Sequence, residues 1–183
     1  MLKRITLVAL LILGLLLPGC SGGSGLKVYV DSIDGYEFAY PNGWVAVQVS
    51  SGADVVFRDL IQTTENVSVV VSQVSGEQSL ADLGKPEEVG QRLAQRVIAP
   101  PESGRQADLI SATSRQTDHQ TYYNLEYVIR LPQEDPLAQQ RHNLASVAVS
   151  RGKLYTLSVS TPEERWSRIQ NRLEEMVNSF TVY

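Results

Sequence analysis

The stretch GKLYTLSVSTPEERWSRIQNRLEEMVNSF, residues 152–180, joins a predicted strand to the clearest helix of the chain. Residues 154–160 are expected to be extended. After them, Thr161 and Glu164 have the spacing of a capping box, and Pro162 suits the first helical position. Apolar side chains then recur at intervals of three and four, at Trp166, Ile169, Leu173, Met176, Val177 and Phe180. Because the opposite face is charged, the stretch predicts an amphipathic helix packed on a sheet.

Most of the preceding chain favours strands. The valine-rich segment NVSVVVSQV favours extended backbone, because β-branched side chains are stiff and pack well on a pleated surface. Asp34-Gly35 predicts a turn, and Arg151-Gly152 predicts a tight hairpin. Strands are expected at residues 27–30, 36–40, 44–49, 54–60, 66–74, 107–116, 122–131, 143–150 and 154–160.

A helical region interrupts the strands near the middle of the chain. Ser79 is expected to cap a short turn, and Pro86 suits the start of a second helix that Pro100-Pro101 ends. The buried face of this second helix is predicted to comprise Val89, Leu93 and Val97. Strands with one central and one C-terminal helix packed on them predict an α+β sandwich around a mostly antiparallel sheet.

Residues 1–19 have the pattern of a secretory signal peptide. A basic start is followed by an almost unbroken apolar run over residues 5–17, which is shorter than the ~20 residues of a membrane-spanning helix. The residues Leu17-Pro18-Gly19-Cys20 resemble a bacterial lipobox, in which a leucine stands three residues before the cysteine and a small residue directly before it. We therefore expect cleavage before Cys20 and attachment of lipid to its thiol.

Cys20 is the only cysteine of the chain, so an internal disulfide is excluded. A free thiol would be a liability in an oxidising compartment, which also favours lipidation. The alternative is an ordinary secretory signal with an unpaired thiol. Residues 20–26 are expected to form the lipidated start and flexible tether of a domain that spans residues 27–183.

The charge of the chain excludes some functions. The formal net charge of −4 becomes −6 when the signal peptide with Lys3 and Arg4 is removed. A mildly acidic domain without a cluster of basic residues argues against nucleic-acid binding and against electrostatic attraction to anionic lipids. The lipid on Cys20 is therefore expected to hold the protein at the membrane.

Motifs of catalysis are absent from the sequence. It lacks G-x-S-x-G, a glycine-rich phosphate loop, H-E-x-x-H and C-x-x-C. The adjacent acidic pairs Glu87-Glu88 and Glu174-Glu175 are expected to be solvated helix faces rather than acid/base couples. Abundant serines and two histidines leave a hydrolase as a remote alternative, but we expect a protein that is not an enzyme.

The two histidines raise the question of a metal site. Asp118 and His119 lie in a polar stretch that a hairpin loop explains without a metal, and His142 stands at the start of a predicted strand, where it can be an exposed residue. Two scattered histidines cannot build a closed zinc site, which needs about four ligands. A weak site of one histidine and one or two carboxylates remains open.

Five segments together resemble the PsbP family of photosystem II extrinsic proteins: DGYEFAYPNGW, SLADLGKPEEV, YYNLEY, GKLYTLSVSTPEERW and VNSF. The resemblance extends from about Asp34 to the C-terminus, and the lipobox points to the cyanobacterial branch. It implies an α/β/α sandwich of the PsbP/Mog1 type and a non-catalytic protein anchored by lipid on the lumenal side of the thylakoid membrane. It also implies a monomeric domain that associates with photosystem II subunits, as an assembly or stability factor for the oxygen-evolving complex or early reaction-centre intermediates.

The resemblance also bears on the metal question. Plant relatives have been linked to divalent metals through a histidine and an acidic residue, and the matching positions here are His142 and Glu163, with Glu where plant members carry Asp. No cofactor is expected to be required, but Zn, Mn or Ca bound weakly at this pair is an expectation. The alternative function is accordingly a lumenal or periplasmic lipoprotein that binds a divalent metal.

Overall fold

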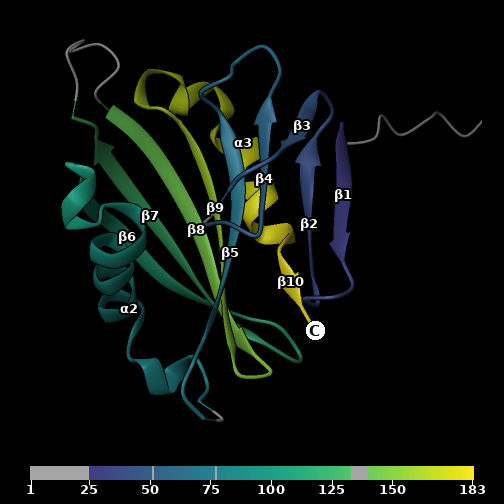
Figure 1. Ribbon diagram of the computed structural model, residues 1–183, viewed down its shortest axis with the longest axis vertical. Coiled ribbons are helices and arrows are strands. Elements are labelled where there is room, and N and C mark those ends of the chain that lie inside the picture. The colour runs from purple at the N-terminus through teal and green to yellow at the C-terminus, as the bar shows by residue number, and fades with distance from the viewer. Residues whose placement is uncertain (1–24, 51, 77, 133–139) are drawn as a thin grey trace, which may run out of the picture.

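A seven-stranded antiparallel sheet forms the centre of the molecule in the computed structural model, which describes residues 25–50, 52–76, 78–132 and 140–183. Its strands follow the order β3-β4-β5-β9-β8-β7-β6, and every pairing between them is antiparallel (Figure 1). The strands are β3 (Trp44–Val47), β4 (Val55–Asp59), β5 (Asn66–Gln73), β6 (Gln106–Gln116), β7 (Thr121–Arg130), β8 (Gln140–Ser150) and β9 (Lys153–Pro162).

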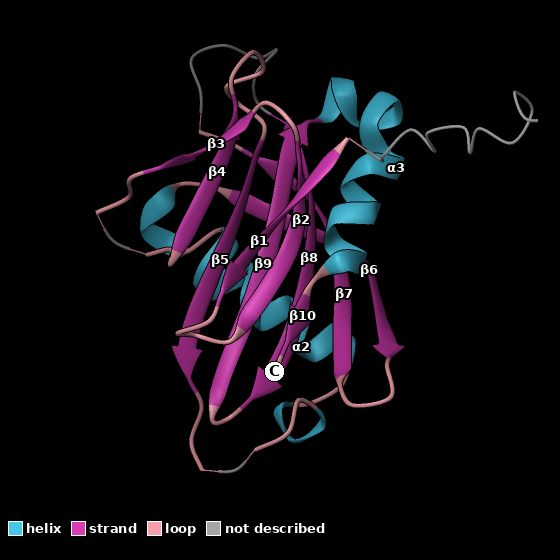
Figure 2. Cartoon of the chain, turned by 90° about the vertical axis from the view of Figure 1, so that its right-hand side faces the viewer, coloured by secondary structure: helices cyan, strands magenta, loops and turns pink. Residues whose placement is uncertain are grey.

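A smaller sheet covers part of one face. It has the order β1-β2-β10, from β1 (Leu26–Asp31), β2 (Tyr36–Pro41) and the C-terminal β10 (Thr181–Val182). Figure 2 shows β1, β2 and β10 in front of the large sheet, beside the long helix α3 (Glu163–Ser179). The first and last strands of the described residues thus belong to the same sheet, because β2 pairs with both β1 and β10.

The two main helices pack on opposite faces of the large sheet. Helix α2 (Pro86–Leu93) contacts β6 and β7, whereas α3 contacts β8, β9 and β2. Side chains alternate between faces along a strand, so each strand contributes to two cores. The core on the α3 face includes Tyr36, Phe38, Tyr155, Leu157, Leu173 and Phe180, and the core on the α2 face includes Leu93, Tyr127, Ala145 and Val147. The predicted α/β/α sandwich is confirmed.

Helix α2 approaches the sheet closely at Gly90. A Cβ there would lie 3.0 Å from a methyl carbon of Leu109 and 3.2 Å from one of Leu125, so a side chain would push the helix away from β6 and β7. The Gly90 carbonyl oxygen also accepts a 2.9 Å hydrogen bond from the buried Tyr127 hydroxyl. A glycine at this position therefore lets the helix and the sheet share one tightly packed core.

The predicted strands and turns are largely confirmed, with boundaries that shift by a few residues. Arg151 and Gly152 have φ angles of 49° and 71°, which is the type I′ geometry of a two-residue hairpin. Strand β8 begins at Gln140, three residues before its predicted start. This shift places His142 inside the strand and buries it, so the prediction of an exposed histidine at a strand end is wrong.

The predicted capping box at the start of α3 is wrong. Strand β9 continues through Pro162, which is the N-cap residue, and no side chain caps the helix. The Thr161 hydroxyl instead donates to Glu65 Oε1, the carboxylate before β5. Thr161 therefore bonds to a buried carboxylate far away in the sequence and not to a backbone N–H of its own helix. The apolar stripe of α3 is confirmed, with Leu173, Met176 and Val177 buried.

The middle helical region is confirmed except for one position. Ser79 exchanges hydrogen bonds with Asp82 at a short 3₁₀ turn, Ala81–Leu83. Val97, however, is 41% exposed, and Ile98 is buried in its place. The cause is a π-helical segment, Ala94–Ile98, in which the Ala99 N–H bonds to the Ala94 oxygen five residues back. This wider turn moves the buried position from the fourth to the fifth residue after Leu93.

Within the described residues, no helix combines the length and the apolar character needed to cross a bilayer. The predicted signal peptide, Cys20 and residues 20–24 of the tether lie outside the described residues. Leu26, the last residue of the predicted tether, is the first residue of β1.

Candidate functional site

His142 lies on the α3 face of the large sheet, between two carboxylates. Its Nδ1 is 2.9 Å from Glu163 Oε2, at the first residue of α3, and its Nε2 is 2.9 Å from Glu126 Oε1, on the neighbouring strand β7. The side chain of His142 is only 5% exposed, whereas those of Glu126 and Glu163 are 28% and 35% exposed. The arrangement is a buried imidazole held at both edges by partly exposed carboxylates.

Trp166 covers this imidazole. Its ring stacks on that of His142 with centroids 3.7 Å apart and planes at 8°. Trp166 is one turn into α3, so the same helix supplies both the covering ring and the carboxylate of Glu163. Only a doubly protonated imidazole carries an N–H at each nitrogen, and that form donates to both carboxylates at once. The contacts therefore tie β7, β8 and α3 together.

The structure brings together the predicted metal pair of His142 and Glu163. It adds Glu126, which the sequence analysis missed, because only the register of β7 against β8 places Glu126 near His142. The two carboxylates lie at opposite edges of the ring, so a single ion cannot contact both together with one ring nitrogen. The pair at Nδ1 offers two ligands, fewer than the four of a closed zinc site.

Asp118 and His119 lie elsewhere. Both are exposed in the loop between β6 and β7, where Thr117 N–H bonds to the Gln120 oxygen. This loop enters β7 at Thr121, whereas His142 pairs with Val128, so the two histidines are about 20 Å apart along the strand. The hairpin interpretation of Asp118 and His119 is confirmed, and they do not join the His142 cluster.

A second carboxylate on the α3 face is paired internally. Glu65 is 4% exposed, accepts from Arg165 Nε in α3, and accepts a 3.3 Å hydrogen bond from Thr161. Its charge is therefore compensated by a cation on the helix that packs over it. Arg165 lies between Glu163 and Trp166 in the first turn of α3, so the start of this helix makes two neighbouring polar contacts, one to Glu65 and one to His142.

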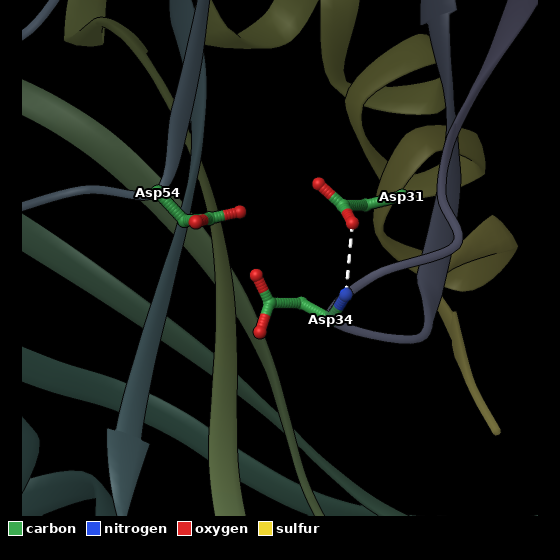
Figure 3. Close-up of side chains that lie close together, drawn as sticks. All are labelled: Asp31, Asp34 and Asp54. Atoms are coloured by element: carbon green, nitrogen blue, oxygen red, sulfur yellow. Dashed lines mark hydrogen bonds between the residues drawn. The ribbon is translucent and has the colours of Figure 1, made fainter.

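Three aspartates form a cluster at another place. One carboxylate oxygen each from Asp31, Asp34 and Asp54 lies within 4.8 Å of the others (Figure 3). Oxygen-only clusters of this kind suit hard cations such as Ca²⁺. Here the cluster already has protein partners, because Lys153 Nζ lies 2.8 Å from Asp34 Oδ1 and the Tyr36 hydroxyl donates to Asp54. Burial, together with these contacts to Asp54, raises the pKa of Tyr36 and keeps its hydroxyl protonated as a donor.

On the α2 face, a groove lies over the strands that α2 does not cover. It has a volume of about 920 Å³ and is lined by small polar residues of β5, β8 and β9, by the π-helical segment, and by three arginines, Arg96, Arg105 and Arg141. No local pattern in the sequence predicts this groove. Arg141 is far in the chain from Arg96 and Arg105, and the three come together only when β8 packs beside the π-helical segment.

Comparison with known proteins identifies the family of the chain. Residues 24–182 match the family model described as PsbP. The chain belongs to the PsbP family. It is 60% identical to CyanoP of Thermosynechococcus vestitus over 183 residues, which is 100% of both chains. This confirms the resemblance that the sequence motifs indicated.

Solved structures agree with the assignment. The solution structure of cyanobacterial PsbP (CyanoP) from Synechocystis sp. PCC 6803 covers 90% of this chain and 96% of that chain, with a TM-score of 0.74 and 43% identity. The Ran-binding protein Mog1p of Saccharomyces cerevisiae covers 86% of this chain and 95% of its own, with a TM-score of 0.59 and 14% identity. At that identity the likeness to Mog1p shows the fold alone.

Proposed function

We propose that this PsbP-family protein is a non-catalytic, lipid-anchored protein of the thylakoid lumen that associates with photosystem II subunits and assists assembly or stability of the complex. The observation that carries the proposal is the family match over residues 24–182 together with 60% identity to CyanoP over the full chain. The polar groups at the start of α3 also support a structural role, since they pair with one another.

Lipid attachment at Cys20 forms part of the proposal. A lipid and a short tether keep the domain close to one membrane face, which raises the effective concentration of a membrane-embedded partner. We expect Cys20→Ser to move the protein from the membrane fraction to the soluble fraction while its fold, measured by circular dichroism, stays unchanged. An ordinary secretory signal predicts the same distribution for both proteins, so retention of the wild type in the soluble fraction would reject the anchor.

Affinity purification tests the association. A C-terminally tagged chain, expressed in a cyanobacterium and captured from detergent-solubilised thylakoids, is expected to recover photosystem II subunits, and Cys20→Ser is expected to recover less. Capture of only unrelated lumenal complexes, or of no photosystem II subunit after mild crosslinking, would reject the proposal. A tagged unrelated lumenal protein serves as the control for non-specific capture.

A second candidate function is weak binding of a divalent metal such as Zn²⁺, Mn²⁺ or Ca²⁺. The observation that favours it is the 2.9 Å contact between His142 Nδ1 and Glu163 Oε2. These residues supply one nitrogen and one carboxylate, so water would have to complete the coordination sphere. Binding would also require the loss of the hydrogen bond between the two side chains.

Calorimetric titration with each ion distinguishes the sites. His142→Ala is expected to abolish binding, and His119→Ala is the matched control that should leave it unchanged. Loss of binding in Asp31→Asn instead would move the ion to the aspartate cluster, and binding unaffected by His142→Ala would remove the His142 site. Neither result would bear on association with photosystem II.

A further inference from the structure

The groove on the α2 face combines a polar floor with an open side. Helix α2 covers β6 and β7, but β5 and β9 turn small polar side chains toward the uncovered part of the same face. The floor includes Ser68, Thr156, Ser158, Ser160 and Asn143. Ligand pockets in proteins combine a concave surface with a few polar groups that orient the ligand, and this groove of about 920 Å³ has such groups along its floor.

The charged side chains that line the groove are all positive. Arg96, Arg105 and Arg141 line it, and no aspartate or glutamate is among its described lining residues. None of the three arginines forms an ion pair with a carboxylate of the part of the chain that the structure describes. This contrasts with a chain whose formal net charge is −4. Excess positive charge in one hollow of an acidic protein favours an anionic partner.

Arg141 is a partly buried arginine of the groove. Burial lowers the pKa of Arg141, as does the nearby charge of Arg105, whereas the charge of Glu65, which forms its ion pair with Arg165, raises it. The guanidinium donates from Nε to Ser160 Oγ at 2.9 Å and from one terminal nitrogen to the Thr64 oxygen, which leaves further N–H groups for a ligand. A partly buried cation without an ion-pair partner is costly, and a bound carboxylate in direct contact lowers that cost.

Asn143 indicates that a ligand of the groove carries hydrogen-bond donors as well as negative charge. The residue is 5% exposed and lines the groove, and its Nδ2 donates to Ser158 Oγ at 2.8 Å. Its Oδ1 has no hydrogen-bond partner among the described residues. Reversal of the amide would leave the nitrogen unpaired instead, so one polar atom of Asn143 has no hydrogen-bond partner among the described residues in either case. With Oδ1 free, the missing partner is a donor, which a carboxylate or phosphate alone does not supply.

The π-helical segment forms one wall of the groove. Its wider turn points Val97 outward, where it lines the groove together with Ile98 and Ile129. Interruptions of this kind in helices are common at functional sites. Val97 and the nearby isoleucines therefore give the groove an apolar side next to its polar floor.

We infer that this groove binds an extended, acidic segment of a partner protein. Such a segment supplies carboxylates for the arginines, backbone N–H groups for Asn143, and aliphatic side chains for the wall at Val97. The lining runs from Val56 on β4 to Ile129 on β7, a span of five strands and about 19 Å. About six residues of extended chain have this length. The inference does not depend on the partner belonging to photosystem II.

Nuclear magnetic resonance titration tests the groove directly. Isotope-labelled chain of residues 20–183 with Cys20→Ser would be titrated with a twelve-residue peptide that repeats Glu-Val-Ser, and with the same peptide carrying Gln in place of Glu. We expect saturable shifts of the Asn143 side-chain amide and of the Ser158 and Arg141 signals with the acidic peptide. The Gln peptide should bind at least tenfold more weakly. Added salt should lower the affinity of the groove for the acidic peptide, because it screens the charges.

Two matched double variants locate the binding. Arg96 and Arg105 are exposed, so the double variant Arg96→Gln/Arg105→Gln should fold normally. Its affinity for the acidic peptide should be at least tenfold lower than that of the wild type. Arg168→Gln/Arg172→Gln removes the same charge from exposed positions of α3 on the other face and should change affinity by less than twofold. Equal losses in both variants, or equal binding of the two peptides, would overturn the inference.

Other anions are tested in the same way. Inorganic phosphate and phosphatidylglycerol vesicles should shift the groove signals less than the acidic peptide at equal charge concentration. If either binds more tightly than the peptide and competes with it, the occupant is a small anion or a lipid headgroup, and the proposed acidic segment is rejected. These results do not bear on whether the affinity purification recovers photosystem II subunits, so the two proposals can fail separately.

Discussion

Neighbouring residues of strand β8 face opposite sides of one sheet and meet opposite electrostatic conditions. His142 points to the α3 face, where Glu126 and Glu163 pair with it and Trp166 covers it. Arg141 and Asn143 point to the α2 face, where the arginine has no described carboxylate partner and the amide oxygen has no hydrogen-bond partner among the described residues. A closed polar network stabilises a fold, whereas an open one is available for a ligand.

The difference follows from the reach of the two helices. Helix α3 is seventeen residues long and lies over β8 and β9, so it can bring Glu163 and Arg165 to the polar groups of its face. Helix α2 is eight residues long and ends in the π-helical segment beside the groove. Substitutions on the α3 face should therefore change stability, and those in the groove should change binding.

The largest effect is expected for Arg165→Gln. It leaves the carboxylate of Glu65 buried without its cation, which should lower the free energy of unfolding by about 3 kcal/mol. Urea denaturation of the soluble domain measures this change. Arg168→Gln, an exposed position on the same helix, is the control and should change stability by less than about 0.5 kcal/mol. Equal effects would show that the Glu65 contact does not contribute.

His142→Ala should lower the free energy of unfolding by about 2 kcal/mol. The change removes the partner of two carboxylates and opens a cavity under Trp166, but water screens Glu126 and Glu163 because both are partly exposed. His119→Ala, in the exposed hairpin loop, should have an effect near zero. A stability of His142→Ala equal to that of wild type would mean that the network on this face is not stabilising.

Ile98→Ala and Val97→Ala compare adjacent positions of the π-helical segment. Ile98 is buried in the α2 core, so Ile98→Ala should lower the free energy of unfolding by about 2 kcal/mol. Val97 is 41% exposed, so Val97→Ala should lower it by less than about 0.5 kcal/mol. The order reverses if this segment is a regular α-helix, because Val97 would then face the core. Val97→Ala should in addition weaken the acidic peptide, since Val97 lines the groove.

Arg141→Gln is expected to change binding more than stability. Loss of the hydrogen bonds to Ser160 and Thr64 is offset by removal of a partly buried charge near Arg105, so stability should change by less than about 1 kcal/mol. Affinity for the acidic peptide should nevertheless fall at least tenfold. A large loss of stability with unchanged peptide affinity would show that Arg141 has a structural role. The two faces of the sheet would then not differ in the way proposed here.

Local patterns in the sequence predicted much of the secondary structure. The apolar stripe of α3, the hairpin at Arg151-Gly152 and the short turn at Ser79 depend on neighbours within a few residues, and all three are confirmed. The errors occur where a distant partner competes with a local one. Thr161 bonds to Glu65 rather than to the helix backbone. In the π-helical segment, Ile98 and not Val97 packs into the core beside β6 and β7.

The candidate sites were predicted less completely. The family resemblance indicated His142 and Glu163, and the structure places them in contact. Glu126 was missed because it is sixteen residues before His142 and meets it only through strand register. The groove arginines have a similar cause, because Arg141 is 36 residues after Arg105 in the chain and meets Arg96 and Arg105 only in the folded structure.

The sequence by itself determined the strands, the amphipathic helix α3, the family and the expectation of a lipid on Cys20, because these depend on short motifs and on the spacing of side chains. Only the tertiary structure decided which charges are paired. Alternation along β8 sends His142 to one face and Arg141 and Asn143 to the other, and the helices cover the first more fully than the second. Pairing of a charge depends on distances across the sheet, which the order of residues in the chain does not contain.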